Sequence, residues 1–380
     1  MLFSEKYILD LPGLEPFENP WVVTVCKVPE LDPLKVQIEK WYDELPDTLK
    51  PRFRPGLLSK NDDKFITAFH EIVIYRYCIE EGWEVEYEPV LDNGLTPDLL
   101  VHTKDKGDFI IEITTLFDSA NVAAGVVREI ELVRRVSAIK TEFVLEISFE
   151  DSPLKDFNPK KFAAEVEKWL DQLPDDKERH RKLFNVHGCT AKIVADKTLP
   201  KPRIGCILMI GNGGAVPDYS KRLKTKLDDK RRKYSSKQQG IPLLIVVGDG
   251  VGHMRVDRHL IDRTLFGQDQ LTIYTDDSKA PRMSKDRSGY FTPSNDTNGK
   301  WIGKNTGVSA VLLSSYNGSE GYEMEMFHNP LASVELPYEL FSKLPQMTPI
   351  VDGQNLTLKR TIGTKESLAE ENIKYRIKFE

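Results

Sequence analysis

Two carboxylates and a hydroxyl lie where a short β-hairpin would bring them together. The stretch from Thr96 to Leu116 reads TPDLLVHTKDKGDFIIEITTL, with two apolar runs on either side of a polar turn that contains Gly107. Such runs around a Gly-containing turn predict a hairpin. Asp98 lies at the start of the first strand. Glu112 and Thr114 lie near the end of the second, two residues apart and therefore on one face.

The predicted hairpin brings the carboxylates of Asp98 and Glu112 close to each other. Two carboxylates beside an apolar sheet repel each other and are costly to bury, and a divalent cation relieves that cost. The pattern therefore indicates a site for a hard metal ion. The alternative is that both residues are solvated at the ends of the hairpin and form no site.

The motif around these carboxylates has a counterpart in a known family. Pro97-Asp98 followed by Glu112-Ile113-Thr114 resembles the PD-(D/E)xK, or restriction-endonuclease-like, nuclease superfamily. The resemblance implies that Asp98 and Glu112 hold Mg²⁺ (or Mn²⁺) and that the chain hydrolyses phosphodiester bonds. In that family a Lys two residues after the Glu helps to activate the attacking water. Here Thr114 has that position and would offer its hydroxyl to water in the metal's shell.

A basic segment could supply the missing ammonium group. Residues 221–233 read KRLKTKLDDKRRK, with eight Lys or Arg side chains, inside a predicted helix from about 218 to 234. Lys226 and Lys230 are four residues apart and share a helical face. The resemblance implies that one of them takes the water-activating or phosphate-neutralising role. The other basic side chains would follow a phosphate backbone without reading its sequence: Lys221, Arg222, Lys224, Arg231, Arg232 and Lys233. A solvated basic face with no site is the alternative.

A helix before the hairpin carries a third acidic candidate. Asn61 to Glu81 has an apolar stripe at helical spacing, formed by Phe65, Phe69, Ile72, Tyr75 and Ile79. Glu71 lies at the edge of this stripe. The nuclease family often places a Glu of its first helix near the metal, so the resemblance implies that Glu71 completes the shell or serves as a base. Otherwise Glu71 is an ordinary solvated helix residue.

The order of the elements extends the resemblance to residues 61–335. Pro242 to Val247 is a near-continuous apolar run, which is typical of a strand buried on both faces by helices. The chain resembles a group of bacterial nuclease-like proteins in the order of Glu71, TPD at 96–98, IEIT at 111–114, KLDDKRRKY at 226–234, PLLIVVGDG at 242–250, LFG at 265–267, GVSAVLL at 307–313 and HNPLA at 328–332.

We therefore expect an α/β protein with a restriction-endonuclease-like core, in which helices flank a mixed central sheet and an αβ segment is inserted. The predicted parts are an N-terminal arm (1–56), the core (57–275) with an insertion around 115–218, and a C-terminal extension (276–380) with a mobile loop. The pattern also predicts a strand at 21–25. Within the insertion it predicts paired strands at 191–195 and 204–210.

Composition limits the setting in which this chemistry would operate. The 380 residues carry a net charge of −6, so contact with nucleic acid must come from a local basic surface. The four Cys are scattered without CxxC spacing, which argues against structural zinc and disulfides and fits the cytoplasm. The first residues contain acidic side chains and no long apolar run, so we expect neither a signal peptide nor a membrane partner.

The leading hypothesis is a Mg²⁺-dependent endonuclease that acts on DNA rather than RNA, in genome defence or repair, and it allows a homodimer. Its rival is a catalytically inactive nucleic-acid-binding module of nuclease fold, which Thr114 in place of Lys favours. A second rival is a nucleotide-binding or scaffold protein that uses the GNGG sequence at 211–214. A strand, a Gly turn and a helix can hold phosphate on backbone N–H groups, although an ordinary tight turn explains the same residues.

Overall fold

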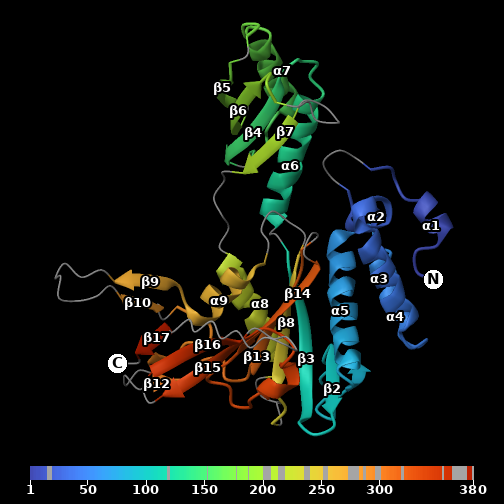
Figure 1. The fold of residues 1–380 in the computed structure, drawn as a ribbon, viewed down its shortest axis with the longest axis vertical. Coiled ribbons are helices and arrows are strands. Elements are labelled where there is room, and N and C mark those ends of the chain that lie inside the picture. Colours follow the sequence, from blue (N-terminus) through green and yellow to red (C-terminus); the bar gives the residue numbers. More distant parts are fainter. Residues whose placement is uncertain are drawn as a thin grey trace. The chain divides into compact units, whose positions relative to one another are not determined.

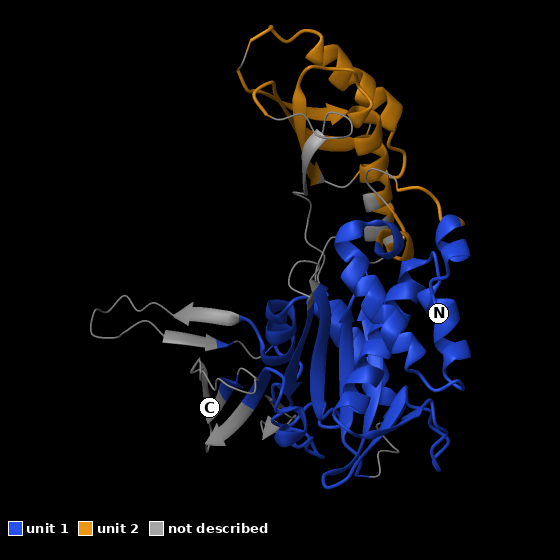
Figure 2. Cartoon of the chain, turned by 45° about the vertical axis from the view of Figure 1, so that its right-hand side comes forward, with its two compact units in different colours: residues 1–9, 25–117, 218–380 blue, residues 10–24, 118–217 orange. Residues whose placement is uncertain are grey.

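The computed structural model describes most of the chain, namely residues 1–14, 19–117, 120–151, 153–176, 178–186, 188–199, 207–212, 219–234, 240–250, 256–272, 282–285, 288–295, 301–317, 321–352, 355–361 and 375–378. The chain forms two compact units, coloured separately in Figure 2. Unit 1 contains residues 1–9, 25–117 and 218–380, and unit 2 contains residues 10–24 and 118–217. Most of unit 2 coincides with the predicted insertion at 115–218.

A large mixed sheet organises unit 1 (Figure 1). In the described residues its order is β1 (Glu84–Tyr87), β2 (Leu99–Thr103), β3 (Gly107–Leu116), β8 (Leu243–Asp249), β13 (Ala310–Asn317), β14 (Gly321–His328), β15 (Gln346–Asp352), β16 (Asn355–Thr361) and β17 (Tyr375–Lys378). The central strands β3, β8 and β13 are parallel, and β1 and β2 continue from β3 as an antiparallel meander. The predicted α/β class with a mixed sheet is confirmed.

Helices cover both faces of this sheet. On one face α8 (Tyr219–Tyr234) and α9 (Arg258–Phe266) pack on alternate residues of β8, including Ile245 and Val247. On the other face lies α5 (Asp62–Glu80), where His70 contacts the backbone of β8. A Cβ atom at Gly248 would lie only 2.5 Å from the His70 ring, so α5 can approach β8 this closely only because residue 248 is glycine.

The helix α5 begins and ends where its sequence predicts. The Asn61 side chain accepts the N–H of Lys64 at 3.0 Å and caps the first turn. Gly82 follows the last turn with a φ of 78°, in the left-handed region that favours glycine. The predicted stripe is buried as far as Tyr75, whereas Ile79 is exposed.

The predicted N-terminal arm is helical. It contains α1 (Glu5–Leu9), α2 (Trp21–Lys27), the 3₁₀ turn η1 (Pro29–Leu31), α3 (Asp32–Asp43) and α4 (Lys50–Leu57), and both α3 and α4 pack against α5. The predicted strand at 21–25 is wrong, because these residues form α2. The β-branched run suggested a strand, but its buried valines pack equally well from a helix.

Unit 2 has its own sheet and core. The sheet order is β5 (His180–Val186), β6 (Cys189–Asp196), β4 (Val144–Asp151) and β7 (Ile207–Asn212), and the helices are α6 (Ala120–Ser137) and α7 (Pro159–Leu170). The predicted pairing of residues 191–195 with 204–210 is wrong, because β4 lies between β6 and β7. Its core contains Phe149, Phe162 and Phe184.

The predicted C-terminal extension supplies β13 to β17 of the large sheet. Short paired strands come before β13 in the sequence: β9 (Asp269–Thr272) pairs with β10 (Arg282–Lys285), and β11 (Ser294–Asn295) pairs with β12 (Trp301–Ile302). The turn η2 (Tyr338–Phe341) precedes β15. Part of the predicted mobile loop lies outside the described residues, but Tyr290 and Phe291 are buried. No helix in the described part of the chain combines the length and apolar composition that a membrane span needs.

Candidate active site

The β2–β3 hairpin sets Asp98 opposite Glu112. Leu99 pairs with Ile111 in the antiparallel ladder, so Asp98, one residue before Leu99, faces the residue that follows Ile111. The Asp98 Oδ2 atom accepts the backbone N–H of Ile113 at 2.6 Å. This hydrogen bond fixes the Asp98 carboxylate against the backbone next to Glu112.

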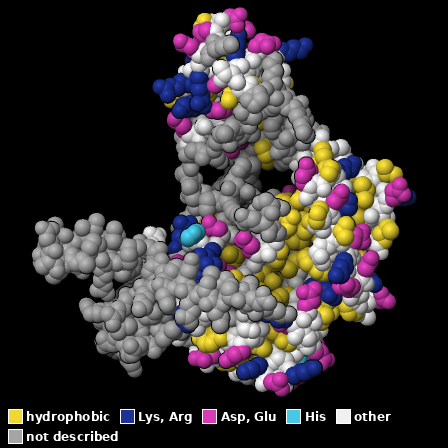
Figure 3. Space-filling view, in the orientation of Figure 1, with side chains coloured by type: hydrophobic (Ala, Val, Ile, Leu, Met, Phe, Trp, Pro, Cys, Tyr) yellow, Lys and Arg dark blue, Asp and Glu magenta, His cyan; other side chains and the backbone are white. Residues whose placement is uncertain are grey.

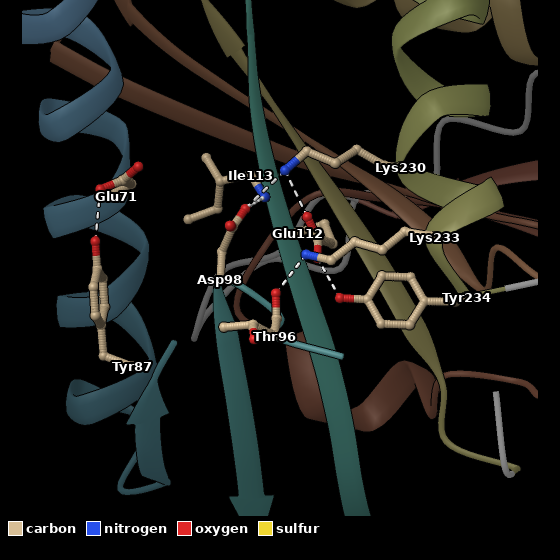
Figure 4. A network of polar contacts seen from close by, with 9 residues as sticks. All are labelled: Glu71, Tyr87, Thr96, Asp98, Glu112, Ile113, Lys230, Lys233 and Tyr234. Atoms are coloured by element: carbon tan, nitrogen blue, oxygen red, sulfur yellow. Dashed lines mark hydrogen bonds and ion pairs between the residues drawn. The ribbon is translucent and has the colours of Figure 1, made fainter. Parts of the chain in front are cut away.

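Lys230 of α8 joins the two carboxylates (Figure 4). Its Nζ atom lies 3.0 Å from Asp98 Oδ2 and 2.5 Å from Glu112 Oε2. The Glu112 side chain is 0 % exposed, whereas those of Asp98 and Lys230 are 30 % and 25 % exposed. The carboxylates therefore converge as the hairpin predicts, and the site is closed on the Glu112 side and accessible on the Asp98 side.

Two further residues of α8 complete the surroundings of Glu112. Lys233 Nζ lies 2.5 Å from Glu112 Oε1 and donates at 2.5 Å to the carbonyl oxygen of Thr96. The Tyr234 hydroxyl also donates to Glu112 Oε1. Sequence reasoning assigned Lys233 to nucleic-acid binding and did not single out Tyr234. Their spacing could have indicated this role, because residues three and four positions after Lys230 share its helical face.

These contacts fix the protonation of the donors. Burial lowers the pKa of Lys230, but the charges of Asp98 and Glu112 outweigh it and hold that pKa above its ordinary value. Burial and the hydrogen bond to Glu112 both raise the pKa of Tyr234. At neutral pH the site therefore contains an ammonium group and a neutral phenol, both of which donate to carboxylate oxygens.

Glu71 lies on α5, near the same site. The Tyr87 hydroxyl of β1 donates to Glu71 Oε2 at 2.9 Å (Figure 4). Burial raises the pKa of Glu71 to about 7, the Tyr87 hydrogen bond opposes this shift, and the charge of Asp98 adds to it. In the described part of the chain, Glu71 forms no hydrogen bond or ion pair with Asp98, Glu112 or Lys230. It is therefore an electrostatic neighbour of the carboxylate pair.

Two other predicted residues lie differently. Thr114 is buried on the face of β3 that carries Glu112, but among the described contacts it has no hydrogen bond to either carboxylate. Lys226 is exposed, and no described contact joins it to Asp98 or Glu112. Of the two helical lysines considered from the sequence, only Lys230 contacts the carboxylates in the described structure.

The predicted nucleic-acid-binding residues differ in their surroundings. Lys221 and Arg232 are exposed, and Arg222 lies 5.9 Å from the centre of the Tyr219 ring. Lys224 donates to the carbonyl oxygen of Ser288 at 2.5 Å. Arg231 pairs at 3.2 Å with Asp228. Asp228 also accepts a hydrogen bond from the hydroxyl of the buried Tyr290 at 3.0 Å.

On the face of unit 1 drawn in Figure 3, surface charge does not mark a binding site. In Figure 3, basic and acidic side chains are interspersed over the visible part of unit 1. Residues 213–218, which include half of the predicted GNGG loop, lie outside the described residues.

The donor set suits a hard metal ion. Carboxylate oxygens are the ligands that Mg²⁺ and Mn²⁺ prefer, and both Asp98 and Glu112 already bind one positive charge, the Lys230 ammonium, between them. A cation held by both carboxylates would take the place of that ammonium. Within the described residues there is no group of three or more His, Cys, Asp or Glu side chains that could hold a metal. Any further ligands would come from backbone oxygens, water or substrate.

A second buried glutamate lies on β14. Glu325 is 6 % exposed and forms two hydrogen bonds with Arg360 of β16, at 2.9 and 3.2 Å, while Arg258 of α9 lies 3.5 Å away. These residues line a cavity of about 590 Å³ whose described walls also include Ser315 and Leu344.

A buried histidine lies between α5 and the sheet. His70 Nδ1 is 2.7 Å from the Ser314 hydroxyl, and Nε2 is 2.9 Å from the carbonyl oxygen of Asp249. Burial lowers the pKa of His70 to about 4. Because Ser314 is fully buried, this cluster joins α5 to the sheet rather than meeting a substrate.

Comparison with protein-family models, with curated proteins and with solved structures gives no match to this chain. The function therefore has to be argued from the geometry and chemistry of the site.

Proposed function

We propose that this chain is a metal-dependent nuclease with a restriction-endonuclease-like core, which hydrolyses phosphodiester bonds of DNA. Asp98 and Glu112 would hold Mg²⁺ or Mn²⁺. One observation carries the proposal: Lys230, from a helix more than a hundred residues away along the chain, contacts both carboxylates of the hairpin, at 3.0 and 2.5 Å. An acidic pair with a neighbouring ammonium is the combination that the family resemblance requires, with Lys230 in place of the strand lysine.

The arrangement of elements supports the same proposal. The helix α5, the β2–β3 hairpin and the parallel strand β8 follow in the order that the resemblance implies. The helix α8 lies between β3 and β8 in the sequence and packs on both strands. This connection brings the basic helix to the carboxylates.

Each residue of the site has a separate task. When bound, the metal would lower the pKa of water and stabilise negative charge on the phosphate. The backbone N–H of Ile113 orients Asp98. Tyr234 and Lys233 orient Glu112 through its Oε1 atom, so that Oε2 faces Asp98 and Lys230. The carboxylates are therefore held in fixed orientations before substrate arrives.

The protonation of Lys230 decides between its two candidate roles. Its raised pKa means that it remains an ammonium group at neutral pH and has no lone pair with which to accept a proton from water. It can instead neutralise charge on the phosphate, which is strongly stabilising in a partly buried site. The phosphate-neutralising role is therefore the one we assign to Lys230.

Glu71 is suited to proton transfer. A side chain whose pKa is near the working pH is an efficient general acid or base, and burial raises the pKa of Glu71 to about 7. Tyr87 holds its carboxyl group in one orientation. We assign to Glu71 the exchange of a proton with the attacking water or the leaving oxygen.

A binding module without catalysis is the second candidate function. Its support is that Glu112 already has hydrogen-bonding partners on both oxygens, from Lys230, Lys233 and Tyr234. A chain that had lost its metal would balance a buried carboxylate in this way. In that case the basic helix would bind the nucleic-acid backbone and no bond would be cut.

Cleavage assays separate the two candidates. Purified protein is incubated with supercoiled plasmid, linear duplex, single-stranded DNA and RNA in Mg²⁺ or Mn²⁺. We expect cleavage of DNA that stops with EDTA and falls by about 10²–10³-fold in Asp98→Asn, because a charge-stabilising group is removed from the transition state. Binding without cleavage of any substrate, in either metal, would favour the binding module.

A further inference from the structure

The Lys230 ammonium has the contacts that a bridging metal ion would need. It bonds Asp98 Oδ2 and Glu112 Oε2 at the same time. Lys233 instead bonds the opposite oxygen of Glu112 and the carbonyl of Thr96. Of these two lysines, Lys230 is the one that a cation shared by Asp98 and Glu112 has to displace.

The charge balance makes that displacement necessary. Two carboxylates, Asp98 and Glu112, are matched by two ammonium groups, Lys230 and Lys233. Adding a divalent ion to this set would leave a large excess of positive charge beside the fully buried Glu112. Uncompensated charge in a buried site is costly, so one ammonium must move away as the metal enters.

Lys230 can move, provided that it finds another partner. Its side chain is 25 % exposed, and a lysine has a compact charge on a flexible stem. Lys226, one helical turn earlier on the same face of α8, is exposed, so a second ammonium group lies next to Lys230. A phosphate of bound nucleic acid would meet this face of α8 and accept the ammonium as it leaves the carboxylates.

We propose that Lys230 is a displaceable cation that couples metal binding to nucleic-acid binding. Without nucleic acid it occupies the bridging position and keeps metal affinity low. With nucleic acid it moves to a phosphate, and the carboxylates become available to the metal. The inference rests on the proposed function, because it assigns the metal to Asp98 and Glu112.

The test is a Mn²⁺ titration of the full chain, with free Mn²⁺ measured by electron paramagnetic resonance, alone and with a phosphorothioate DNA duplex that resists cleavage. In the wild type we expect the duplex to lower the Kd for Mn²⁺ by about 10-fold, within the usual range of coupling between sites. In Lys230→Gln, Mn²⁺ should bind without duplex about as tightly as it binds the wild type with duplex, because the competing charge is gone. The duplex should then change the Kd by less than about 3-fold, since coupling has been removed.

Three measurements control for indirect effects. Lys343→Gln removes a lysine whose ion pair with Glu81 is exposed, and it should leave the Mn²⁺ affinity and the coupling unchanged. Lys230→Arg keeps the charge and should keep metal affinity low. Because coupling is reciprocal, Mn²⁺ should tighten duplex binding by the wild type by the same factor, measured by fluorescence anisotropy. That last measurement needs no variant and therefore remains valid if Lys230→Gln does not fold.

The outcomes separate this inference from the proposed function. If Asp98→Asn abolishes Mn²⁺ binding but the duplex does not change the wild-type affinity, the metal site stands and the displaceable cation is wrong. The same conclusion follows if Lys230→Gln folds and retains the wild-type affinities. If Asp98→Asn leaves Mn²⁺ binding unchanged, the carboxylates do not hold the metal, and both proposals are overturned.

Discussion

Glu112 and Glu325 are two buried glutamates of one sheet, and each lies within ion-pair distance of two basic side chains. The partners are lysines at Glu112 (the lysine site) and arginines at Glu325 (the arginine site). Glu112 on β3 meets two lysines from α8. Glu325 on β14 meets two arginines, one of which forms a two-pronged contact from β16. A guanidinium fork is planar and holds a carboxylate in one geometry, whereas an ammonium is a point charge that exchanges partners readily.

The acidic neighbour is the second difference. Glu112 has Asp98 beside it, bound to the same ammonium, whereas the described contacts of Glu325 are with its arginines. If the Lys230 ammonium moved, the lysine site would offer two carboxylates to a metal ion and an ammonium group to a phosphate. The arginine site joins β14, β16 and α9. We infer that the first glutamate belongs to a site that exchanges ligands and the second to one that holds the fold together.

The largest expected effect is on the arginine site. Arg360→Ala leaves Glu325 buried with Arg258 as its remaining described partner, and losing one member of a buried pair costs about 3–5 kcal/mol of unfolding free energy. Urea unfolding followed by circular dichroism measures this. Lys343→Ala, which breaks an exposed pair, should cost no more than about 1 kcal/mol. Equal losses in the two variants would contradict a structural role for the arginine pair.

Lys230→Ala should act on turnover instead. We expect single-turnover cleavage of DNA to fall about 10²-fold, because charge stabilisation of the transition state is lost. Stability should fall less than in Arg360→Ala, since Glu112 retains Lys233 and Tyr234. The comparison is Arg360→Ala assayed under conditions where it is folded, which should cut at the wild-type rate. If Lys230→Ala lowers stability but not the cleavage rate, the site around Glu112 is structural, like the site around Glu325, and the contrast between them is wrong.

Glu71→Gln tests the electrostatics around the lysine site. The folded-state pKa of Glu71, about 7, is above its ordinary value of 4.5, so the folded chain binds this proton more tightly than the unfolded chain. The contribution of Glu71 to stability is therefore fully present below pH 4.5 and is lost as the pH rises through about 7. Above pH 7 the Gln variant should be more stable than the wild type by about 1–3 kcal/mol, with little difference near pH 4.

A matched variant checks the cause of that shift. The Tyr87 hydrogen bond holds the pKa of Glu71 down, so Tyr87→Phe should extend the fall in stability to higher pH. Unfolding free energies measured from pH 4 to pH 9 compare the three proteins. The same pH dependence in wild type and Glu71→Gln would show that Glu71 is not the titrating group.

The smallest effect is expected on the exposed side of α8. Arg232→Ala should reduce the slope of log affinity for DNA against log salt concentration by about one, as expected for one lost phosphate contact. Arg231→Ala should change it less, because the Arg231 side chain is 26 % exposed and pairs with Asp228, whereas Arg232 is more exposed to solvent. Anisotropy titrations at several salt concentrations measure both slopes. A larger effect from Arg231 would mean that its pair with Asp228 opens on binding.

Local patterns predicted the elements of the site well. The apolar stripe of α5, the two apolar runs of the hairpin and the continuous apolar run of β8 each correspond to an observed element. The hairpin also predicted that Asp98 and Glu112 would converge. These features depend on residues close in the sequence, where side-chain periodicity and turn chemistry decide the structure.

Features set by distant contacts could not be predicted in the same way. Lys233 looked like one member of a basic surface, and only the packing of α8 on β3 directs it to Glu112. Tyr87 orients Glu71 because β1 lies at the edge of the sheet beside α5. Likewise, β7 pairs with β4 rather than with β6 because of tertiary contacts, which the local sequence does not specify.

The pairing of β3 with β8 has a consequence for synthesis on the ribosome. Ile110 pairs with Leu243, and residues 118–217 of unit 2 are translated between them. A nascent chain therefore presents an unpaired, apolar β3 edge while β4 to β7 have already been made and can form their own sheet. We expect late closure of the large sheet, slow folding because its contacts are distant in sequence, and dependence on chaperones until β8 has emerged.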